Sequence, residues 1–325
     1  MRQTTIILCL LLTIGQAWAQ KNNKDLYYQN EGKFRIAQFT DLHYMPEKPE
    51  AQVVIDNLNE ALDAEKPQLV VFTGDVVTAK DSKDAWDKVL ATVVERKIPW
   101  AVVFGNHDDE QNWTRQEIMD YIAKKPYCMG QAGPKDVAGC GNYILKVKNP
   151  SDKKTKTILY FMDSQSYSKI DSIKGYGWFD FSQIQWYKKT SAKLTKENNK
   201  QPLPALAFFH IPLSEYSILA SNDSNILGTK KEKECAGTLN SGMFTAMKEA
   251  GDVIGTFVGH DHDNDYIGDY YGIKLAYGRF SGSKVTYFNL GLNGCRIIEL
   301  DVAKPNFETY IRLYGGEKIN QYPNH

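Results

Sequence analysis

The chain has 325 residues, of which 42% are hydrophobic and 24% are charged, a balance typical of a globular protein with a hydrophobic core. Lysine plus arginine and aspartate plus glutamate both number 39, so the formal net charge is zero. Proteins that bind nucleic acid through electrostatics usually carry a basic excess, so we expect no nucleic-acid partner.

The first 19 residues have the pattern of a secretory signal peptide. Arg2 supplies a positive charge, Ile6–Ile14 form a short apolar run, and Ala17-Trp18-Ala19 matches a small-x-small cleavage site. The run is shorter than the roughly 20 residues that a membrane-spanning helix needs. Residues 1–19 are therefore predicted to be removed, which leaves an exported protein, periplasmic or extracellular, with no membrane attachment.

Residues 20–33 are polar and are predicted to form an exposed lead-in. Apolar runs then alternate with amphipathic stretches, which indicates strand–helix–strand units with helices outside a sheet. The predicted strands of this part are Phe34–Phe39, Leu69–Phe72, Trp100–Phe104, Thr157–Met162, Ala205–Phe209 and Val253–Val258. The predicted helices are Val53–Ala64, Ala85–Glu95, Phe181–Leu194 and Met243–Ala250.

From Tyr266 onward the pattern changes to short strands separated by glycine turns. These strands are expected at Tyr271–Ala276, Val285–Phe288, Arg296–Leu300 and Phe307–Leu313. No linker divides residues 34–325, which are predicted to form a single α/β domain around a two-layered sheet core.

Four cysteines remain once the signal peptide is removed: Cys128, Cys140, Cys235 and Cys295. An exported protein can form disulfides, and Cys128 and Cys140 bracket a loop rich in glycine and proline. We expect that pair, with Cys235–Cys295 as a second, and free structural thiols as the alternative. No CxxC pair occurs, so cysteine-ligated zinc is not expected.

Polar residues that can carry chemistry occur in five motifs, and each motif follows a predicted strand. They are Asp41-Leu42-His43, Gly74-Asp75, Gly105-Asn106-His107-Asp108, His210 and Gly259-His260-Asp261-His262. Five of the six histidines belong to these motifs. Since ligands bind at the carboxyl ends of strands in α/β sheets, we expect the motifs to converge.

The residue types in these motifs suit metal ions. Aspartate, histidine and asparagine offer oxygen and nitrogen ligands for zinc, iron, manganese or cobalt. In an extended segment alternate side chains point the same way, so Asp41 and His43 can bind one ion together, and so can His260 and His262. A carboxylate can bridge two ions. Glycines 74, 105 and 259 are expected to let the backbone turn sharply at the strand ends.

The five motifs together resemble the calcineurin-like metallophosphoesterase superfamily, whose signature is D-x-H, G-D, G-N-H-[DE], H and G-H-x-H in that order. The secretory leader and the segment Tyr277-Gly278-Arg279-Phe280 look like a secreted bacterial branch related to purple acid phosphatases. The resemblance implies a four-layer α/β/β/α sandwich, in which two mixed β-sheets pack face to face with flanking helices.

The same resemblance implies roles for individual residues. One metal ion would be held by Asp41, His43, Asp75 and His262, and the second by Asp75 as a bridge with Asn106, His210 and His260. His107 would be the acid beside the leaving group, with Asp108 orienting its ring.

The chain departs from true purple acid phosphatases at two positions. Those enzymes have glycine where this chain has His43, and their tyrosine ligand would fall at Thr78. The purple tyrosinate–iron(III) colour is therefore not expected. The cofactor is predicted to be two metal ions, with iron, zinc and manganese left open.

The expected function is a dinuclear-metal phosphoesterase that hydrolyses a small phosphorylated substrate. It would act as an acid-phosphatase-like phosphomonoesterase, by attack of a metal-bridging hydroxide with His107 as general acid. One alternative is a phosphodiesterase or nucleotide pyrophosphatase on the same metal pair. Another is a catalytically inactive scaffold that keeps the fold for binding. Neither the natural substrate nor the oligomeric state is predicted.

Overall fold

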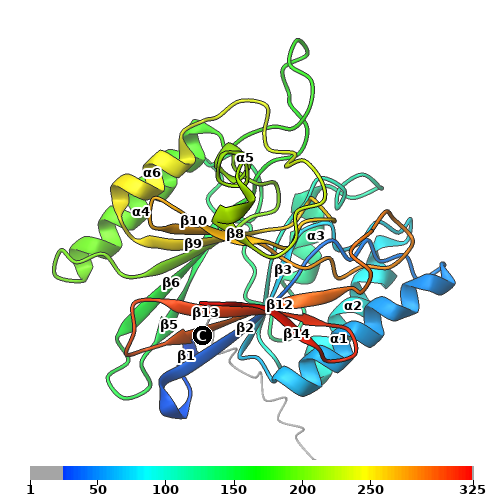
Figure 1. Cartoon of the computed structure of the whole chain (residues 1–325), viewed down its shortest axis with the longest axis horizontal. Helices are drawn as coiled ribbons and strands as arrows, with labels where there is room; N and C mark the ends of the chain where they lie inside the picture. The colour runs from blue at the N-terminus through cyan, green and yellow to red at the C-terminus, as the bar shows by residue number, and fades with distance from the viewer. Residues whose placement is uncertain (1–24, 324–325) are drawn as a thin grey trace, which may run out of the picture.

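The computed structural model describes residues 25–323 as an α/β fold in which two mixed β-sheets lie between two sets of helices (Figure 1). The predicted signal peptide, residues 1–19, lies outside the described residues. Within residues 25–323, no helix is both long and apolar enough to cross a membrane.

One sheet has six strands in the order β14-β13-β12-β2-β3-β4. Strands β2, β3 and β4 run parallel, whereas β12, β13 and β14 add to the edge of β2 as antiparallel neighbours. The strands are β2 (Lys33–Phe39), β3 (Leu69–Thr73), β4 (Trp100–Val103), β12 (Gly294–Asp301), β13 (Phe307–Leu313) and β14 (Lys318–Tyr322).

The other sheet has eight strands in the order β1-β5-β6-β7-β9-β11-β10-β8. Its centre, from β6 to β11, is parallel, and the neighbours of this centre, β5 and β10, pair antiparallel. The strands are β1 (Leu26–Tyr27), β5 (Tyr143–Lys148), β6 (Thr155–Phe161), β7 (Ala205–Phe208), β8 (Ile226–Leu227), β9 (Val253–Val258), β10 (Ile267–Tyr270) and β11 (Ile273–Tyr277).

The two sheets pack face to face, and alternation along each strand decides which side chain enters which layer. In β3, Leu69 and Val71 enter the core between the sheets, whereas Val70 and Phe72 face the helices. Strand β7 divides in the same way. Both faces of these strands are buried, which explains their uninterrupted apolar sequences.

Helices cover the outer face of each sheet (Figure 1). The six-stranded sheet packs against α1 (Gln52–Glu65), α2 (Ser82–Glu95) and α3 (Arg115–Ile122). The eight-stranded sheet packs against α4 (Phe181–Glu197), α5 (Ser214–Leu219) and α6 (Met243–Ala250). Short 3-10 turns occupy Asn30–Gly32, Pro49–Ala51 and Asp223–Asn225. The predicted fold class, two mixed sheets with flanking helices, is confirmed.

Local sequence signals explain where two of these helices begin. At α3, the Thr114 side chain accepts a hydrogen bond from the backbone of Glu117, whose carboxylate reaches back to Thr114. Asp180 and Gln183 form the same capping box at α4. Such reciprocal pairs satisfy backbone N–H groups that the first turn leaves without partners.

The structure contradicts three of the sequence predictions about the fold. Residues 25–33 are not an exposed lead-in, because β1 pairs with β5, and Leu26 and Tyr28 are buried. Val285–Phe288 is a loop rather than a strand. Neither predicted disulfide forms among the described residues, because Cys140, Cys235 and Cys295 are free thiols.

Candidate metal centre

The five polar motifs follow β2, β3, β4, β7 and β9 directly. The first three strands belong to the six-stranded sheet and the last two to the eight-stranded sheet. Backbone hydrogen bonds join the first two motifs, since His43 N–H donates to the Asp75 carbonyl over 2.9 Å. The carboxyl ends of the parallel strands in both sheets therefore bring their motifs to one place, as predicted.

Six buried side chains form two adjacent groups. In one group Asp41, His43 and His262 place their ligand atoms within 4.8 Å of one another. In the other group the same holds for Asp75, His210 and His260. Each group has one carboxylate and two imidazoles, a ligand set suited to transition metals.

The Asp75 carboxylate lies between the two groups. Its Oδ2 is 3.2 Å from His210 Nε2 and 3.7 Å from His43 Nε2. Asp41 Oδ1 lies 3.6 Å from His262 Nε2 and 3.9 Å from His210 Nε2. Asp75 Oδ2 therefore lies between a histidine of the first group and a histidine of the second.

Hydrogen bonds on the far side of two imidazoles orient their Nε2 atoms toward the carboxylates. His210 Nδ1 is 2.8 Å from the Thr73 carbonyl oxygen, and His262 Nδ1 is 2.9 Å from that of Tyr287. Donation from Nδ1 to a carbonyl leaves the lone pair on Nε2. This arrangement is common around histidines that bind metals.

Three buried polar atoms at the site have no hydrogen-bond partner among the described residues: Asn106 Oδ1, Asn106 Nδ2 and His260 Nε2. An unsatisfied buried donor or acceptor costs about 1–3 kcal/mol. Cations bound by these groups would remove that cost for the acceptor atoms. Asn106 stands next to His107 in the chain, and the backbone N–H of His107 donates to Asp75 Oδ1 over 2.8 Å, so the backbone that carries Asn106 lies close to Asp75.

The backbone is strained at four of these positions. Asp41, His43, Asp75 and His260 have φ angles of 53°, 43°, 50° and 81°, which lie in the left-handed region. Such conformations cost on the order of 1–3 kcal/mol each and tend to cluster at active sites.

The glycines of the motifs serve close packing more than sharp turning. A Cβ on Gly105 would lie 2.1 Å from Asp75 Oδ1, and one on Gly259 would lie 1.9 Å from Thr40 Oγ1. Of the three motif glycines only Gly74 has a positive φ, of 92°. The predicted backbone turn therefore applies to Gly74, whereas Gly105 and Gly259 leave room for the ligand loops.

Burial and charge move the pKa values of the histidines apart. Burial lowers the pKa of His43 to about 3, against the attraction of Asp75. Burial and the neighbouring His210 also hold the pKa of His260 well below its usual value. Neutral imidazole is the form that binds metals. Burial opposes protonation of His210 too, but Asp75 and Asp41 raise its pKa to about 9. Bound cations would neutralise the Asp75 and Asp41 carboxylates in place of this proton, so His210 could bind a metal in its neutral form.

Asp108 has a different task from the predicted one. Its buried carboxylate accepts hydrogen bonds from the backbone N–H groups of Asp75, Val76 and Gly105, over 2.9, 2.8 and 2.8 Å. Burial and the nearby Asp75 raise the pKa of Asp108 to about 6. Asp108 therefore anchors the loop that carries Asp75 and does not orient the ring of His107.

Glu110 holds the His107 ring instead. His107 Nδ1 and Glu110 Oε2 are 2.7 Å apart, which leaves the Nε2 of His107 available to another group. The half-buried His107 ring lies 5.5 Å from that of His43, measured between centroids. A partly exposed histidine at the rim of the two groups is well placed to meet a substrate.

Arg115 fixes the loop that contains Asn106 and His107. It is buried at the start of α3, where its Nη2 donates to the Gly105 carbonyl over 2.6 Å and its Nη1 pairs with Asp163. A buried guanidinium paired with a carboxylate makes strong hydrogen bonds of fixed direction.

Sequence reasoning missed three side chains at the site. Glu110 stands three residues after His107, a spacing from which its contact could have been suspected. The Tyr176 ring packs edge-on against His260 at 4.4 Å, and Tyr287 stacks on His262 at 4.3 Å. Both tyrosines belong to loops without regular structure, and no local pattern marks them.

Similarity to known proteins agrees with this geometry. The chain is 37% identical over 301 residues to probable inactive purple acid phosphatase 29 of Arabidopsis thaliana, covering 83% of this chain and 77% of that protein. It is 36% identical over 326 residues to phosphatase DCR2 of Saccharomyces cerevisiae, covering 89% of this chain and 55% of that protein.

Two solved structures share the fold. A dimetal phosphatase from Danio rerio superposes with a TM-score of 0.59 and 15% identity over 88% of this chain and 96% of its own. A purple acid phosphatase from yellow lupin superposes with a TM-score of 0.54 and 12% identity, over 89% of this chain and 53% of its own. Residues 34–264 match the family described as calcineurin-like phosphoesterase, and the chain belongs to that family.

Proposed function

We propose that this protein is a dinuclear-metal phosphoesterase that hydrolyses phosphate monoesters, with His107 as the general acid. The position of Asp75 between two buried groups of ligand atoms is the observation that carries the proposal. One group would hold an ion through Asp41, His43 and His262. The other would hold an ion through Asn106, His210 and His260.

When bound, two such cations neutralise charge on the phosphoryl group and lower the pKa of the attacking water. Side chains of the protein would supply the proton and hold the ligand loops in place. Glu110 orients the His107 ring so that Nε2 can give a proton to the departing oxygen, a step worth roughly 10²–10⁴-fold in rate. Asp108 and Arg115 hold the two loops that carry Asp75 and His107.

A catalytically inactive scaffold is the alternative, and the names of three Arabidopsis relatives, all called probable inactive purple acid phosphatases, favour it. The yeast relative is named a phosphatase. This chain keeps both ligand groups and the His107–Glu110 pair. Those residues support catalysis more than binding alone.

The test is metal analysis followed by parallel assays. Protein purified without chelators should contain about two iron, zinc or manganese ions per chain and should hydrolyse 4-nitrophenyl phosphate. Faster hydrolysis of bis(4-nitrophenyl) phosphate would identify a phosphodiesterase instead. Two bound ions without hydrolysis of either ester would favour the scaffold.

We also propose that the protein is exported and acts on small phosphorylated substrates in the periplasm or outside the cell. The signal-peptide pattern of residues 1–19 supports this, and membership of a secreted bacterial branch rests on that pattern and on residues 277–280. Intact mass of protein expressed with its leader should show cleavage after Ala19. A chain that keeps residues 1–19 would refute the proposal.

A further inference from the structure

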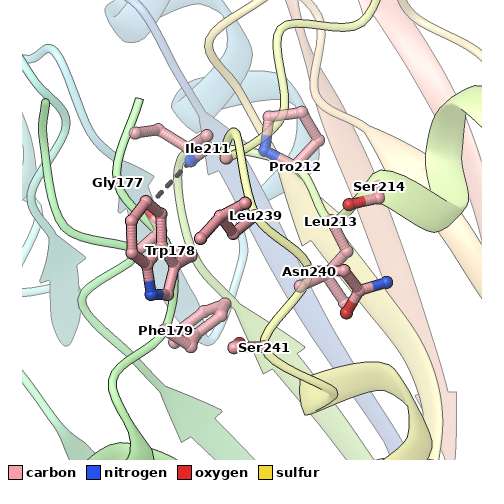
Figure 2. Close-up of a pocket in the computed structure, with 12 residues that line it drawn as sticks. Gly177, Trp178, Phe179, Ile211, Pro212, Leu213, Ser214, Leu239, Asn240 and Ser241 are labelled. Atoms are coloured by element: carbon pink, nitrogen blue, oxygen red, sulfur yellow. Dashed lines mark hydrogen bonds between the residues drawn. The ribbon is translucent and has the colours of Figure 1, made fainter. Parts of the chain in front are cut away.

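A mostly apolar pocket of about 480 Å³ opens between two loops, residues 165–181 and residues 237–241. Three large apolar residues that line the pocket are unusually exposed to solvent: Ile170 is 47%, Phe181 79% and Leu239 46% exposed. Figure 2 shows a neighbouring, smaller pocket that shares Trp178, Phe179 and Leu239 with this lining. Exposed apolar groups gathered in one concavity usually mark a binding site.

The walls of this pocket are held in place by hydrogen bonds between the two loops. Thr238 N–H donates to the Tyr176 carbonyl over 3.0 Å, and Thr238 Oγ1 donates to the Lys174 carbonyl over 2.8 Å. The backbones approach so closely that a Cβ on Gly237 would lie 2.3 Å from the Gly177 carbonyl oxygen. The pocket is therefore formed before any ligand arrives, as small-molecule sites usually are.

Two tyrosines connect this pocket to the metal centre. The Tyr167 ring lines the pocket, and its hydroxyl lies 3.4 Å from Oε1 of Glu110, the carboxylate that holds His107. Tyr176 stacks on Tyr167 at 5.5 Å and packs against His260 at 4.4 Å. One wall of the pocket, Tyr167, thus contacts the carboxylate that holds His107. His107 is the proposed donor of the proton that the departing oxygen of an ester must receive.

The lining carries little charge. Lys169 and Asp180 contribute one charge of each sign, and the other lining residues are neutral. An anionic group would meet no net positive charge there. The volume falls within the roughly 300–1,000 Å³ of typical small-molecule pockets. An uncharged apolar group of moderate size is the occupant that fits this chemistry.

We propose that this pocket receives the organic leaving group of the phosphate ester, and that preferred substrates carry a bulky apolar or aromatic leaving group. The inference rests on the proposed phosphoesterase function and specifies its substrate class. It assigns substrate selection to Leu239, Trp178 and Tyr167, which line the pocket and bind no metal.

The test compares phenyl phosphate with 2-naphthyl phosphate, whose leaving groups have similar acidity but different apolar size. The wild-type protein should favour the naphthyl ester by about tenfold in kcat/KM, the discrimination expected of an extra apolar group in an enzyme pocket. Leu239→Glu should abolish this preference, mainly by raising KM for the naphthyl ester. Leu239 is exposed enough for the charge to be tolerated by the fold.

Ile218→Glu is the matched control, because Ile218 is 53% exposed on α5 and does not line the pocket. This variant should keep the naphthyl preference. The inference would be overturned if the wild type had equal kcat/KM for both esters. It would also be overturned if Leu239→Glu and Ile218→Glu lost the naphthyl preference to the same extent. Calorimetric binding of 2-naphthol, weakened by Leu239→Glu alone, is expected independently of turnover. If the protein with two metals hydrolyses no ester at all, the proposed function fails, whereas unchanged naphthol binding in Leu239→Glu refutes the pocket itself.

Discussion

Replacing Glu110 with glutamine tests which carboxylate orients the proposed general acid. The His107–Glu110 contact is 2.7 Å long, and its two side chains are 35% and 42% exposed. A hydrogen bond between charged groups contributes about 1.5–3 kcal/mol, and solvent exposure reduces this contact to about 1–1.5 kcal/mol. Each 1.36 kcal/mol is a factor of ten in rate, so kcat should fall about five- to tenfold.

The fall should depend on the leaving group, because only a poor leaving group needs a proton as it departs. Phenyl phosphate should therefore lose the full factor in Glu110→Gln, whereas 2,4-dinitrophenyl phosphate should change little. Glu110→Asp should restore part of the rate, and Glu95→Gln, at an exposed glutamate on α2, should leave it unchanged. An equal loss for both esters, or no loss for either, would refute the orienting role of Glu110.

Two further substitutions test the metal centre and the frame around it. Asp75→Ala should release both metal ions, because the Asp75 carboxylate faces both ligand groups. The control Asp63→Ala, on α1, should retain both ions. Elemental analysis that finds two ions in Asp75→Ala would contradict the bridging position. Glu65→Gln should destabilise the fold by about 1–3 kcal/mol near neutral pH, measured by urea unfolding, because Tyr310 and Lys318 lose a buried carboxylate partner. Burial raises the pKa of Glu65, but these two partners outweigh burial and lower it overall, so the contribution is present above the unfolded-state pKa and disappears as pH falls through the folded-state value. If the difference in unfolding free energy between the wild type and Glu65→Gln stayed the same in acid, the proposed role of the Glu65 carboxylate would be wrong.

The candidate metal centre could be located from the sequence because its polar motifs stand out against the apolar strands that precede them. Polar motifs directly follow apolar strands such as Leu69–Thr73, and the carboxyl ends of parallel strands share one edge of a sheet. Strand alternation and helix amphipathicity also predicted most of the central strands and four helices. These features depend on residues close together in sequence, so a single chain is enough to show them.

Predictions that required a side-chain direction or a distant partner were less successful. The family resemblance implies that Asp108 orients the His107 ring, yet the Asp108 carboxylate accepts from the backbone N–H of Asp75, and Glu110 contacts the ring instead. The pairing of β1 with β5 joins residues more than 100 positions apart, and β1 itself has only two residues. No local pattern predicts such a contact.

The sequence by itself determined the α/β class, through short-range periodicity, and the candidate ligands with the types of atom they offer, through residue chemistry. The four-layer sandwich followed from the resemblance of the five motifs to a known family. Only the tertiary structure decided which carboxylate supports His107, and only it showed Tyr176 and Tyr287 against the ligand histidines and a pocket beside them. The reason is physical: loops without periodicity take their positions from the packing of the two sheets and from hydrogen bonds across distant segments. Those contacts form only when the whole chain has folded.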